Sequence, residues 1–480
     1  MTWTFFAQGM AVAVGAASLY GLTPTAEAAA GAPARPFDFN GDGHAELVIG
    51  SPGGAVGGRA GAGFVSVVPG SRAGLDTRRR RVIHQDSAGV PGAAERGDRF
   101  GDAIASADFD RNGYADLAVG APGEDSSGRS NAGSVTILWG SPGGLKRAVS
   151  YGEARTPGKG HRFGESLAVG DIQRDGSPEL FVTVPGTSTF TWIYFAGART
   201  SVAAAAPGPA RPASARDVTD SWVASGDVNG DGRGDVAYAW YDFDGGRVDE
   251  RRGFTVFHGT ADGRFTRGRT VHTPVHSLAV ADFNGDRRAD VAVGSAFDGP
   301  TGGQVTVYPG APFTGLGRGY SISQASPGVP NDPLVEDCFG AALAAGDVNG
   351  DGRADLAVGA PKAEVGRIPD AGRAYLLYGS PRGLTGRGSQ SLSQNTKGVP
   401  GGAEPYDGFG EQVALLDHTR DGRADLTVGA PAEDSGNGSV VFVRGTAAGL
   451  STAGSTAVTA SSLGVRDRDA RLGGRLGRTG

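Results

Sequence analysis

Short apolar runs rich in Val, Leu, Ala and Ile recur along the chain, separated by segments rich in Gly, Asp, Asn and Pro. Residues 100–108 alternate between apolar and polar, and the runs at 116–121 and 134–139 are almost wholly apolar. Runs of this length bounded by turn residues indicate β-strands. No long stretch shows a helical period. The pattern predicts an all-β protein built from many short strands.

The strands belong to a repeat. Seven segments share an acidic loop followed by a short apolar strand, which often ends in Gly-Ala-Pro. The loops begin at Asp38, Asp108, Asp171, Asp227, Asp282, Asp347 and Asp417. Successive starts lie 55 to 70 residues apart, which is room for about four strands with their turns, the content of one propeller blade. We therefore predict a single seven-bladed β-propeller.

A Phe-Gly pair opens the strand before several of these loops, at Phe100, Phe163, Phe339 and Phe409. Together, Phe-Gly, the acidic loop and Gly-Ala-Pro resemble the FG-GAP repeat of integrin α subunits and of secreted bacterial relatives. The resemblance covers roughly residues 36 to 480. Blades four and five depart from it, because the segments at Trp222 and His276 replace the Phe-Gly strand and Gly-Ala-Pro is lost.

The two ends of the chain complement each other. The first repeat begins at Phe37 without a Phe-Gly strand, and the tail from Gly464 resembles a connector followed by such a strand, with Leu472-Gly473 in the Phe-Gly place. We predict that residues 472–476 form the innermost strand of the first blade. This pairing would close the ring and remove exposed sheet edges.

Composition agrees with a propeller that carries an export signal. The 84 glycines suit tight turns, and the regular apolar runs argue against disorder. The single Cys338 cannot form an internal disulfide and is interpreted as a buried thiol. Residues 1–30 are interpreted as a signal peptide, with an apolar stretch at 10–22 and small residues around Ala26 and Ala28. No base precedes Arg35, so either the true start lies upstream or the signal is atypical.

The remaining residues, 31–480, are predicted to form the propeller, secreted and without a transmembrane anchor, because no apolar run is long enough to span a bilayer.

The acidic loops follow the pattern D-x-[DN]-x-[DN]-G-x-x-[DE]. Ca²⁺ takes six to eight oxygen ligands, and alternate positions of a curled loop point inward. We predict several Ca²⁺ ions, bound by side-chain oxygens at loop positions one, three, five and nine and by the backbone carbonyl at position seven. The ligands are Asp38, Asn40, Asp42, His44 and Glu46; Asp108, Asp110, Asn112, Tyr114 and Asp116; Asp227, Asn229, Asp231, Arg233 and Asp235; Asp282, Asn284, Asp286, Arg288 and Asp290; Asp347, Asn349, Asp351, Arg353 and Asp355; and Asp417, Thr419, Asp421, Arg423 and Asp425.

The loops are not expected to bind equally. The Asp171 loop has Gln173 at the third position and Pro178 at its exit, and we predict that it is an empty structural turn. Arg287 replaces the sixth-position glycine of the Asp282 loop, and Thr419 is a weaker third ligand.

Charge counting supports metal binding. The seven loops hold three carboxylates each, 21 of the 51 acids, which leaves 30 acids against 45 Lys and Arg. Clustered carboxylates repel one another unless a cation neutralises them. A metal-filled protein would be mildly basic, which favours an anionic glycan or envelope polymer as partner. GC-rich coding is an alternative explanation of the basic residues, because only four of the 45 are Lys and the rest are Arg.

Other motifs are weaker. In Arg233-Gly234-Asp235 the aspartate is a predicted metal ligand, and Arg96-Gly97-Asp98 lies in a connector. No catalytic signature is present, and Gly164-Glu165-Ser166 is interpreted as core on an inner strand.

The resemblance to integrin α subunits implies that partners dock on the face opposite the calcium loops. The segments concerned are 123–133, 362–372, 432–438 and the connectors that hold Arg96, Asp332 and Tyr406.

Two functions remain open. The first is a binding or adhesion module, monomeric and not an enzyme, for an unidentified protein or glycan rather than for nucleic acid. The second is an extracellular hydrolase or lyase acting on polysaccharide or lipid. A carboxylate pair facing the central channel, outside the calcium loops, would favour the second function.

Overall fold

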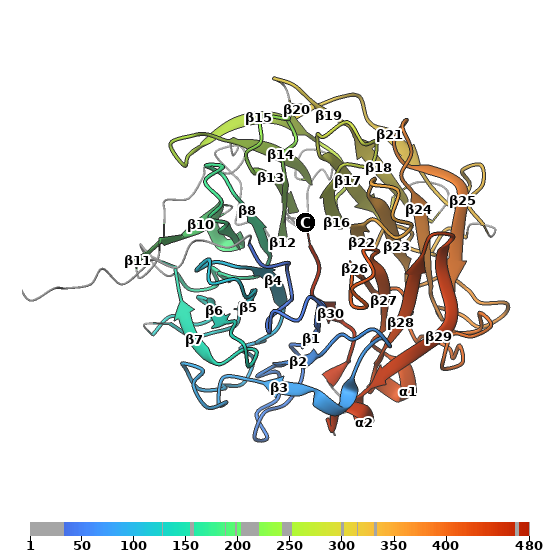
Figure 1. Cartoon of the computed structure of the whole chain (residues 1–480). Coiled ribbons are helices and arrows are strands. Elements are labelled where there is room, and N and C mark those ends of the chain that lie inside the picture. Colours follow the sequence, from blue (N-terminus) through green and yellow to red (C-terminus); the bar gives the residue numbers. More distant parts are fainter. Residues whose placement is uncertain are drawn as a thin grey trace, which may run out of the picture.

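The computed structural model describes residues 33–479, except 127, 154–157, 188, 197–198, 203–219, 242–251, 299–301, 314, 331–333 and 466–469. Seven four-stranded antiparallel sheets are arranged radially around a central axis, so the predicted seven-bladed β-propeller is confirmed (Figure 1). The predicted signal peptide lies outside the described residues. No helix within the described ranges is long and apolar enough to cross a membrane.

Each blade runs from an innermost strand outward. The innermost strands, in blade order, are β30 (Arg475–Leu476), β4 (Ala103–Ala107), β8 (Leu167–Gly170), β12 (Asp220–Gly226), β16 (Ser277–Ala281), β22 (Ala342–Gly346) and β26 (Gln412–Leu416). The second strands are β1 (Leu47–Ser51), β5 (Asp116–Ala121), β9 (Glu179–Val184), β13 (Asp235–Tyr241), β17 (Asp290–Ser295), β23 (Asp355–Ala360) and β27 (Asp425–Ala430).

The third strands are β2 (Phe64–Val68), β6 (Ser134–Trp139), β10 (Thr189–Ala196), β14 (Arg252–Gly259), β18 (Gln304–Tyr308), β24 (Arg373–Tyr378) and β28 (Ser439–Thr446). The outer strands are β3 (Arg81–Ile83), β7 (Arg147–Tyr151), β11 (Arg199–Val202), β15 (Phe265–Val271), β21 (Tyr320–Ile322), β25 (Thr385–Leu392) and β29 (Gly449–Thr459). A small hairpin, β19 (Gly310–Ala311) and β20 (Gly315–Leu316), and the short helices η1 (Thr77–Arg79), η2 (Pro185–Thr187), α1 (Glu433–Gly436) and α2 (Ala460–Leu463) complete the described elements.

The core lies between the blades. Seven hydrophobic clusters each join two neighbouring blades, and one of them joins the seventh blade to the first. Second strands such as β5 and β23 are buried along their whole length, because a neighbouring blade covers each face. This is why these strands are almost continuously apolar in the sequence.

The glycines of Phe-Gly and Gly-Ala-Pro meet across the blade interfaces. A Cβ added to Gly120 of the second blade would lie 2.0 Å from the carbonyl oxygen of Gly164 in the third, which is closer than any real contact. The same close approach joins Gly50 to Gly101, Gly294 to Gly340, Gly359 to Gly410 and Gly429 to Gly473. Glycine is therefore required here by space between blades.

The third and fourth blades lack this glycine pair and pack through aromatic rings instead. Thr183 occupies the Gly-Ala-Pro glycine position and is fully buried. The ring of Phe190 lies 5.7 Å from Tyr238 and 5.3 Å from Phe257, measured between centroids. Large side chains thus take the place of the close backbone approach where the motif is degenerate.

The tail closes the ring as predicted. In β30, Leu476 pairs with Ile49 and Arg475 with Gly50 of β1, so the tail supplies the innermost strand of the first blade. The backbone N–H of Gly477 donates to the carbonyl of Val48 at 2.9 Å. Leu472 is fully buried, like the phenylalanines whose place it takes. The clasp therefore joins residues more than 400 positions apart in the sequence.

Candidate metal-binding loops and the central channel

The seven acidic loops share one curled backbone. Positions four and six both adopt the left-handed conformation, as at Gly230 (φ 79°) and Gly232 (φ 83°). Arg111, Arg174 and Arg420 adopt it at position four, and Arg287 at position six. The curl turns backbone N–H groups toward the first aspartate: in the Asp227 loop, Gly230 donates to one carboxylate oxygen and Gly232 to the other, both at 2.7 Å.

The ninth-position carboxylate fastens each loop to its blade. Asp116, Asp235, Asp290, Asp355 and Asp425 are almost fully buried. Each accepts a hydrogen bond from a backbone N–H of its own loop and another from a glycine near the end of the third strand. In the Asp108 loop these donors are Phe109 at 2.8 Å and Gly140 at 2.7 Å. These carboxylates are structural as well as candidate ligands.

The Asp108 loop brings three carboxylates together. One oxygen from each of Asp108, Asp110 and Asp116 lies within 4.8 Å of the others. Burial raises the pKa of Asp116 to about 8 and also raises that of Asp110, because a carboxylate removed from water without a cation is costly to ionise. The donor set is all oxygen and suits a hard divalent cation.

The Asp38 loop fits a cation for a second reason. Its Asp38 Oδ1 is buried and has no hydrogen-bond partner among the described residues, whereas Oδ2 accepts from the N–H of Gly43 at 2.9 Å. Burial also raises the pKa of Glu46 to about 8. An orphaned buried oxygen beside a second buried carboxylate is the kind of group that a cation satisfies.

The remaining predicted ligands lie in the same register but are not drawn into such a cluster. The position-seven arginines of four loops pair with the position-five aspartates: Arg233 with Asp231 at 3.5 Å, Arg288 with Asp286 at 2.5 Å, Arg353 with Asp351 at 3.4 Å and Arg423 with Asp421 at 3.6 Å. Metal ligation by the thirty residues named above remains a prediction.

The Asp171 loop keeps the curl without the third ligand. Asp171 accepts from the N–H groups of Asp175 and Gly176 as its counterparts do. The amide of Gln173 lies beside Gly263 in the β14–β15 turn of the next blade. This placement agrees with a purely structural role for the loop.

Neither Arg-Gly-Asp sequence presents its aspartate. Asp235 is fully buried and Asp98 is 2% exposed, and Asp98 accepts from the N–H of Glu95. A receptor that reads an exposed aspartate would not reach either one.

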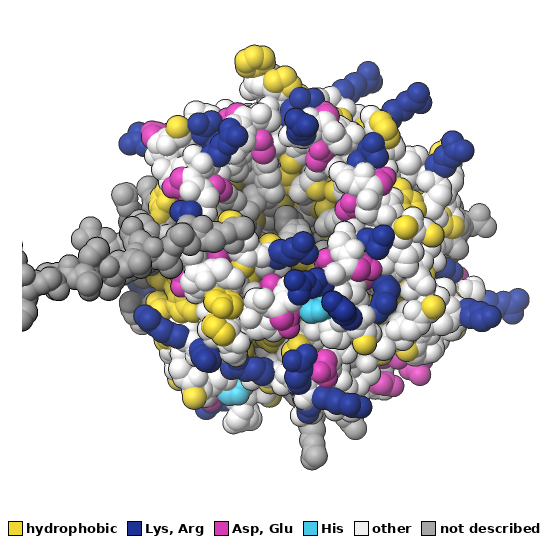
Figure 2. Space-filling model, viewed as in Figure 1, with side chains coloured by type: hydrophobic (Ala, Val, Ile, Leu, Met, Phe, Trp, Pro, Cys, Tyr) yellow, Lys and Arg dark blue, Asp and Glu magenta, His cyan; other side chains and the backbone are white. Residues whose placement is uncertain are grey.

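A cavity of about 330 Å³ lies in the central channel, at the end opposite the acidic loops. Its lining comes from the first residues of the innermost strands, for example Ala103 of β4 and Gln412 of β26. Six of the seven innermost strands then run through the channel and end at an acidic loop, as β4 does before Asp108. The two candidate sites therefore occupy opposite ends of one axis. Figure 2 shows acidic and basic side chains interspersed around the hollowed centre of one face.

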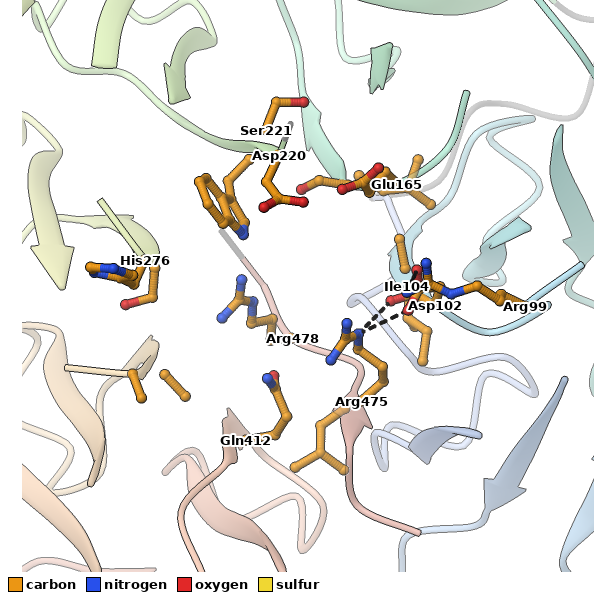
Figure 3. A pocket seen from close by; sticks show the side chains of 18 of the residues that line it. Arg99, Asp102, Ile104, Glu165, Asp220, Ser221, His276, Gln412, Arg475 and Arg478 are labelled. Atoms are coloured by element: carbon orange, nitrogen blue, oxygen red, sulfur yellow. Dashed lines mark hydrogen bonds and ion pairs between the residues drawn. The ribbon is translucent and has the colours of Figure 1, made fainter. Parts of the chain in front are cut away.

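Charged residues line this cavity (Figure 3). Asp102 lies 2.8 Å from Arg99 and 3.2 Å from Arg475, and Arg162 lies 3.0 Å from Glu165. Burial raises the pKa of Glu165 to about 8, against the opposing effect of Arg162. This shift favours the protonated form of Glu165 near neutral pH. The interpretation of Glu165 as core is wrong, because its side chain lines the channel.

The sequence carries a signal for this cavity that is not a known catalytic motif. Asp102 and Glu165 both follow a Phe-Gly pair directly, at the position where the innermost strand enters the channel. Arg475 and Arg478 reach the cavity only because the tail closes the first blade.

Comparison with known proteins supports the repeat assignment. The FG-GAP repeat family matches residues 37–68, 100–138, 339–377 and 409–443, and the FG-GAP-like repeat family matches residues 227–293. Among curated proteins, mouse phosphatidylinositol-glycan-specific phospholipase D is 40% identical over 116 residues, which is 23% of this chain and 13% of that protein. Human integrin alpha-IIb is 35% identical over 182 residues, 36% of this chain and 16% of that protein. The chain thus matches less than a fifth of the length of these relatives.

A solved structure shows a related fold. A lectin of Agrocybe aegerita, described as recognising non-reducing terminal N-acetylglucosamine, has a TM-score of 0.51 at 13% identity, with 90% of this chain and 94% of that chain covered. At this identity the likeness concerns the fold alone.

Proposed function

Because the chain is a β-propeller of FG-GAP repeats similar to those of integrin α subunits, we propose that it is a secreted, calcium-binding module that binds a protein or glycan. The observation that carries the proposal is the oxygen cluster of Asp108, Asp110 and Asp116 in a loop whose curl recurs in every blade. Secretion is supported by the apolar stretch at 10–22 and the small residues that follow it.

Calcium would act on the loops as a counter-ion. Three carboxylates within 4.8 Å repel one another, and Ca²⁺ supplies the positive charge while accepting the remaining oxygens of the curled loop. Asp108, Asp110 and Asp116 would hold the ion in the second blade, and Asp38 with Glu46 in the first. The rigid ring would leave the opposite face, with its connectors, for partner binding.

Calorimetric titration of chelator-stripped protein with CaCl₂ tests the metal part. We expect saturable binding of several ions and a higher melting temperature, because an ion that binds only the folded state stabilises it. Asp347→Ala should lower the calcium-dependent increase in melting temperature. Asp171→Ala, its matched control in the degenerate loop, should not. Identical melts with calcium and with excess chelator would contradict the proposal.

The partner is tested with glycan arrays and cell-surface binding, each with calcium and with chelator. Calcium-dependent capture of a defined glycan or protein would support a binding module. Binding that chelator leaves unchanged would separate partner recognition from the metal.

One observation favours a second function, hydrolysis of a polysaccharide or lipid. Glu165 and Asp220 face the central channel outside the acidic loops, and Glu165 carries a raised pKa that suits a proton donor. A relative is named as a phospholipase D. Turnover of a polysaccharide or of a phosphatidylinositol glycan that is lost in Glu165→Gln and retained in Glu411→Gln would establish this function. Absence of turnover across such a panel would leave the binding module as the function of the channel face.

A further inference from the structure

Arg478 stands out among the charged groups of the channel cavity. Its guanidinium donates one hydrogen bond, to the carbonyl of Leu343 at 2.8 Å, and no carboxylate lies within 4 Å of it among the described residues. Burial lowers its pKa to about 10, with a further contribution from nearby Arg475. A guanidinium has five N–H donors, so this half-buried cation retains most of its hydrogen-bonding capacity.

The carboxylates of the cavity are engaged with other arginines. Asp102 lies between Arg99 and Arg475. Arg162 lies 3.0 Å from Glu165 and 3.9 Å from Asp220. Four arginines thus face three carboxylates in the lining of the cavity. The cavity has an excess of positive charge, and Arg478 is the arginine that pairs with no carboxylate among the described residues.

The side of the cavity facing Arg478 is suited to hydroxyl groups. Figure 3 shows Asp220 and Arg478 facing each other across the cavity, with Gln412 beside Arg478. The Asp220 side chain is 43% exposed and accepts hydrogen bonds, and Trp222 adds an aromatic surface to the lining. Asp220 disfavours a doubly charged ligand at this spot, because like charges repel. A volume of about 330 Å³ is at the small end of ligand pockets.

We propose that the channel cavity binds an acidic sugar, a hexuronic acid, and that Arg478 holds its carboxylate. Asp220 would accept hydrogen bonds from the hydroxyl groups of the sugar, and the amide of Gln412 would accept from them or donate to them. Arginine binds a carboxylate in a bidentate manner, with charge-assisted hydrogen bonds. The single negative charge of a hexuronate matches the guanidinium of Arg478, and its ring hydroxyls match the polar side chains of Asp220 and Gln412. The site names a ligand class for the proposed binding module and lies at the end of the channel away from the calcium loops.

Isothermal titration of the calcium-loaded protein with glucuronate tests the proposal, with its neutral methyl ester and with glucose as comparators. We expect saturable binding of glucuronate and at least tenfold weaker binding of both neutral sugars. Arg478→Met should lower glucuronate affinity at least tenfold, whereas Arg382→Met, an exposed arginine in the β24–β25 turn outside the cavity, should not change it. A melt of each variant confirms that it folds.

Equal affinity for glucuronate and its methyl ester in the unaltered protein would overturn the proposal without any variant. Unchanged binding by a folded Arg478→Met protein would also overturn it. Tighter binding of an oligogalacturonate than of free galacturonate would identify a polysaccharide end as the source of the uronic acid. Equal affinity would identify the free sugar. If the calcium titration shows no binding to the acidic loops, the glucuronate result still stands, because the two sites lie at opposite ends of the channel.

Discussion

Individual residues in the acidic loops are selected by backbone conformation as much as by ligand chemistry. Arg287 occupies a position with φ 69° that is glycine in the other six loops. Its N–H still donates to Asp282 at 2.7 Å, so the curl survives with a side chain in a conformation that costs about 1 kcal/mol or more. The strain is local to the Asp282 loop.

Arg287→Gly should therefore stabilise the protein. We expect the free energy of unfolding to rise by about 0.5–1 kcal/mol, because the relieved strain exceeds the greater freedom of glycine in the unfolded chain. The reciprocal change, Gly352→Arg, should lower it by about the same amount; an added Cβ there meets nothing within 4 Å, so conformation alone is tested. Chemical denaturation measures both. A destabilised Arg287→Gly protein would show that the arginine side chain outweighs its backbone strain.

Glu165 gives the channel a pH dependence whose sign follows from burial. The carboxyl titrates near 4.5 when exposed and near 8 in the folded protein, where Arg162, Arg99, Asp220 and Asp102 also act on it. Between these values the folded state holds more protons, so its stability falls as pH rises. Glu165→Gln should remove this loss and gain stability relative to the unaltered protein from pH 5 to 8.

Melts of both proteins across this range test the effect of Glu165. Glu411→Gln is the matched control, since Glu411 occupies the same position of the seventh blade with its side chain 40% exposed. A difference between Glu165→Gln and the unaltered protein that stays constant with pH would contradict the buried, protonated state.

At the scale of elements, the glycine pairs decide how closely two blades approach. Gly429→Ala places a Cβ 2.0 Å from the carbonyl oxygen of Gly473, where backbone must move. We expect a loss of roughly 1–3 kcal/mol or more in unfolding free energy. Gly359→Ala, which makes the same contact with Gly410 between blades six and seven, should cost a similar amount.

The control for these variants is Gly402→Ala, because an added Cβ at Gly402 meets nothing within 4 Å and its φ is not left-handed. It should leave stability unchanged or slightly higher. If Gly429→Ala melts like Gly402→Ala, the ring is not closed by the same tight contact as its internal interfaces.

Some of this architecture was predictable from sequence, and some was not. The repeat spacing, the pattern of short strands and the unpaired first blade predicted the propeller and the closure of the first blade by the tail, because each depends on residue types at repeated positions. The structure adds the register, in which Leu476 pairs with Ile49. The left-handed fourth loop position was missed since arginine fills it three times. The approach of Gly120 to Gly164 and the position of Arg478 across the cavity from Asp220 were also missed. They arise between blades, where the packing geometry determines which side chains face each other.

At the scale of the whole molecule, the tail holds the ring together. The first blade is built from both ends of the chain, and one hydrophobic cluster that includes Leu472 and Leu476 joins the seventh blade to the first. Without β30, the inner edge of β1 would present unpaired backbone groups, and the glycine contact between Gly429 and Gly473 would be lost. The cluster between the seventh and first blades would also lose Leu472 and Leu476.

Deletion of residues 462–480 should therefore do more than shorten the chain. We expect a lower melting temperature and concentration-dependent aggregation, because an exposed strand edge pairs readily with other chains. Adding a synthetic peptide of residues 462–480 should restore part of the lost stability if β30 acts by pairing with β1. The matched peptide carries Gly473→Ala, whose Cβ would lie 2.6 Å from the carbonyl oxygen of Ser439, and it should restore less. Thermal melts and light scattering measure both effects. A truncated protein that melts like the intact one would show that the six remaining blades and the incomplete first blade hold the ring without its clasp.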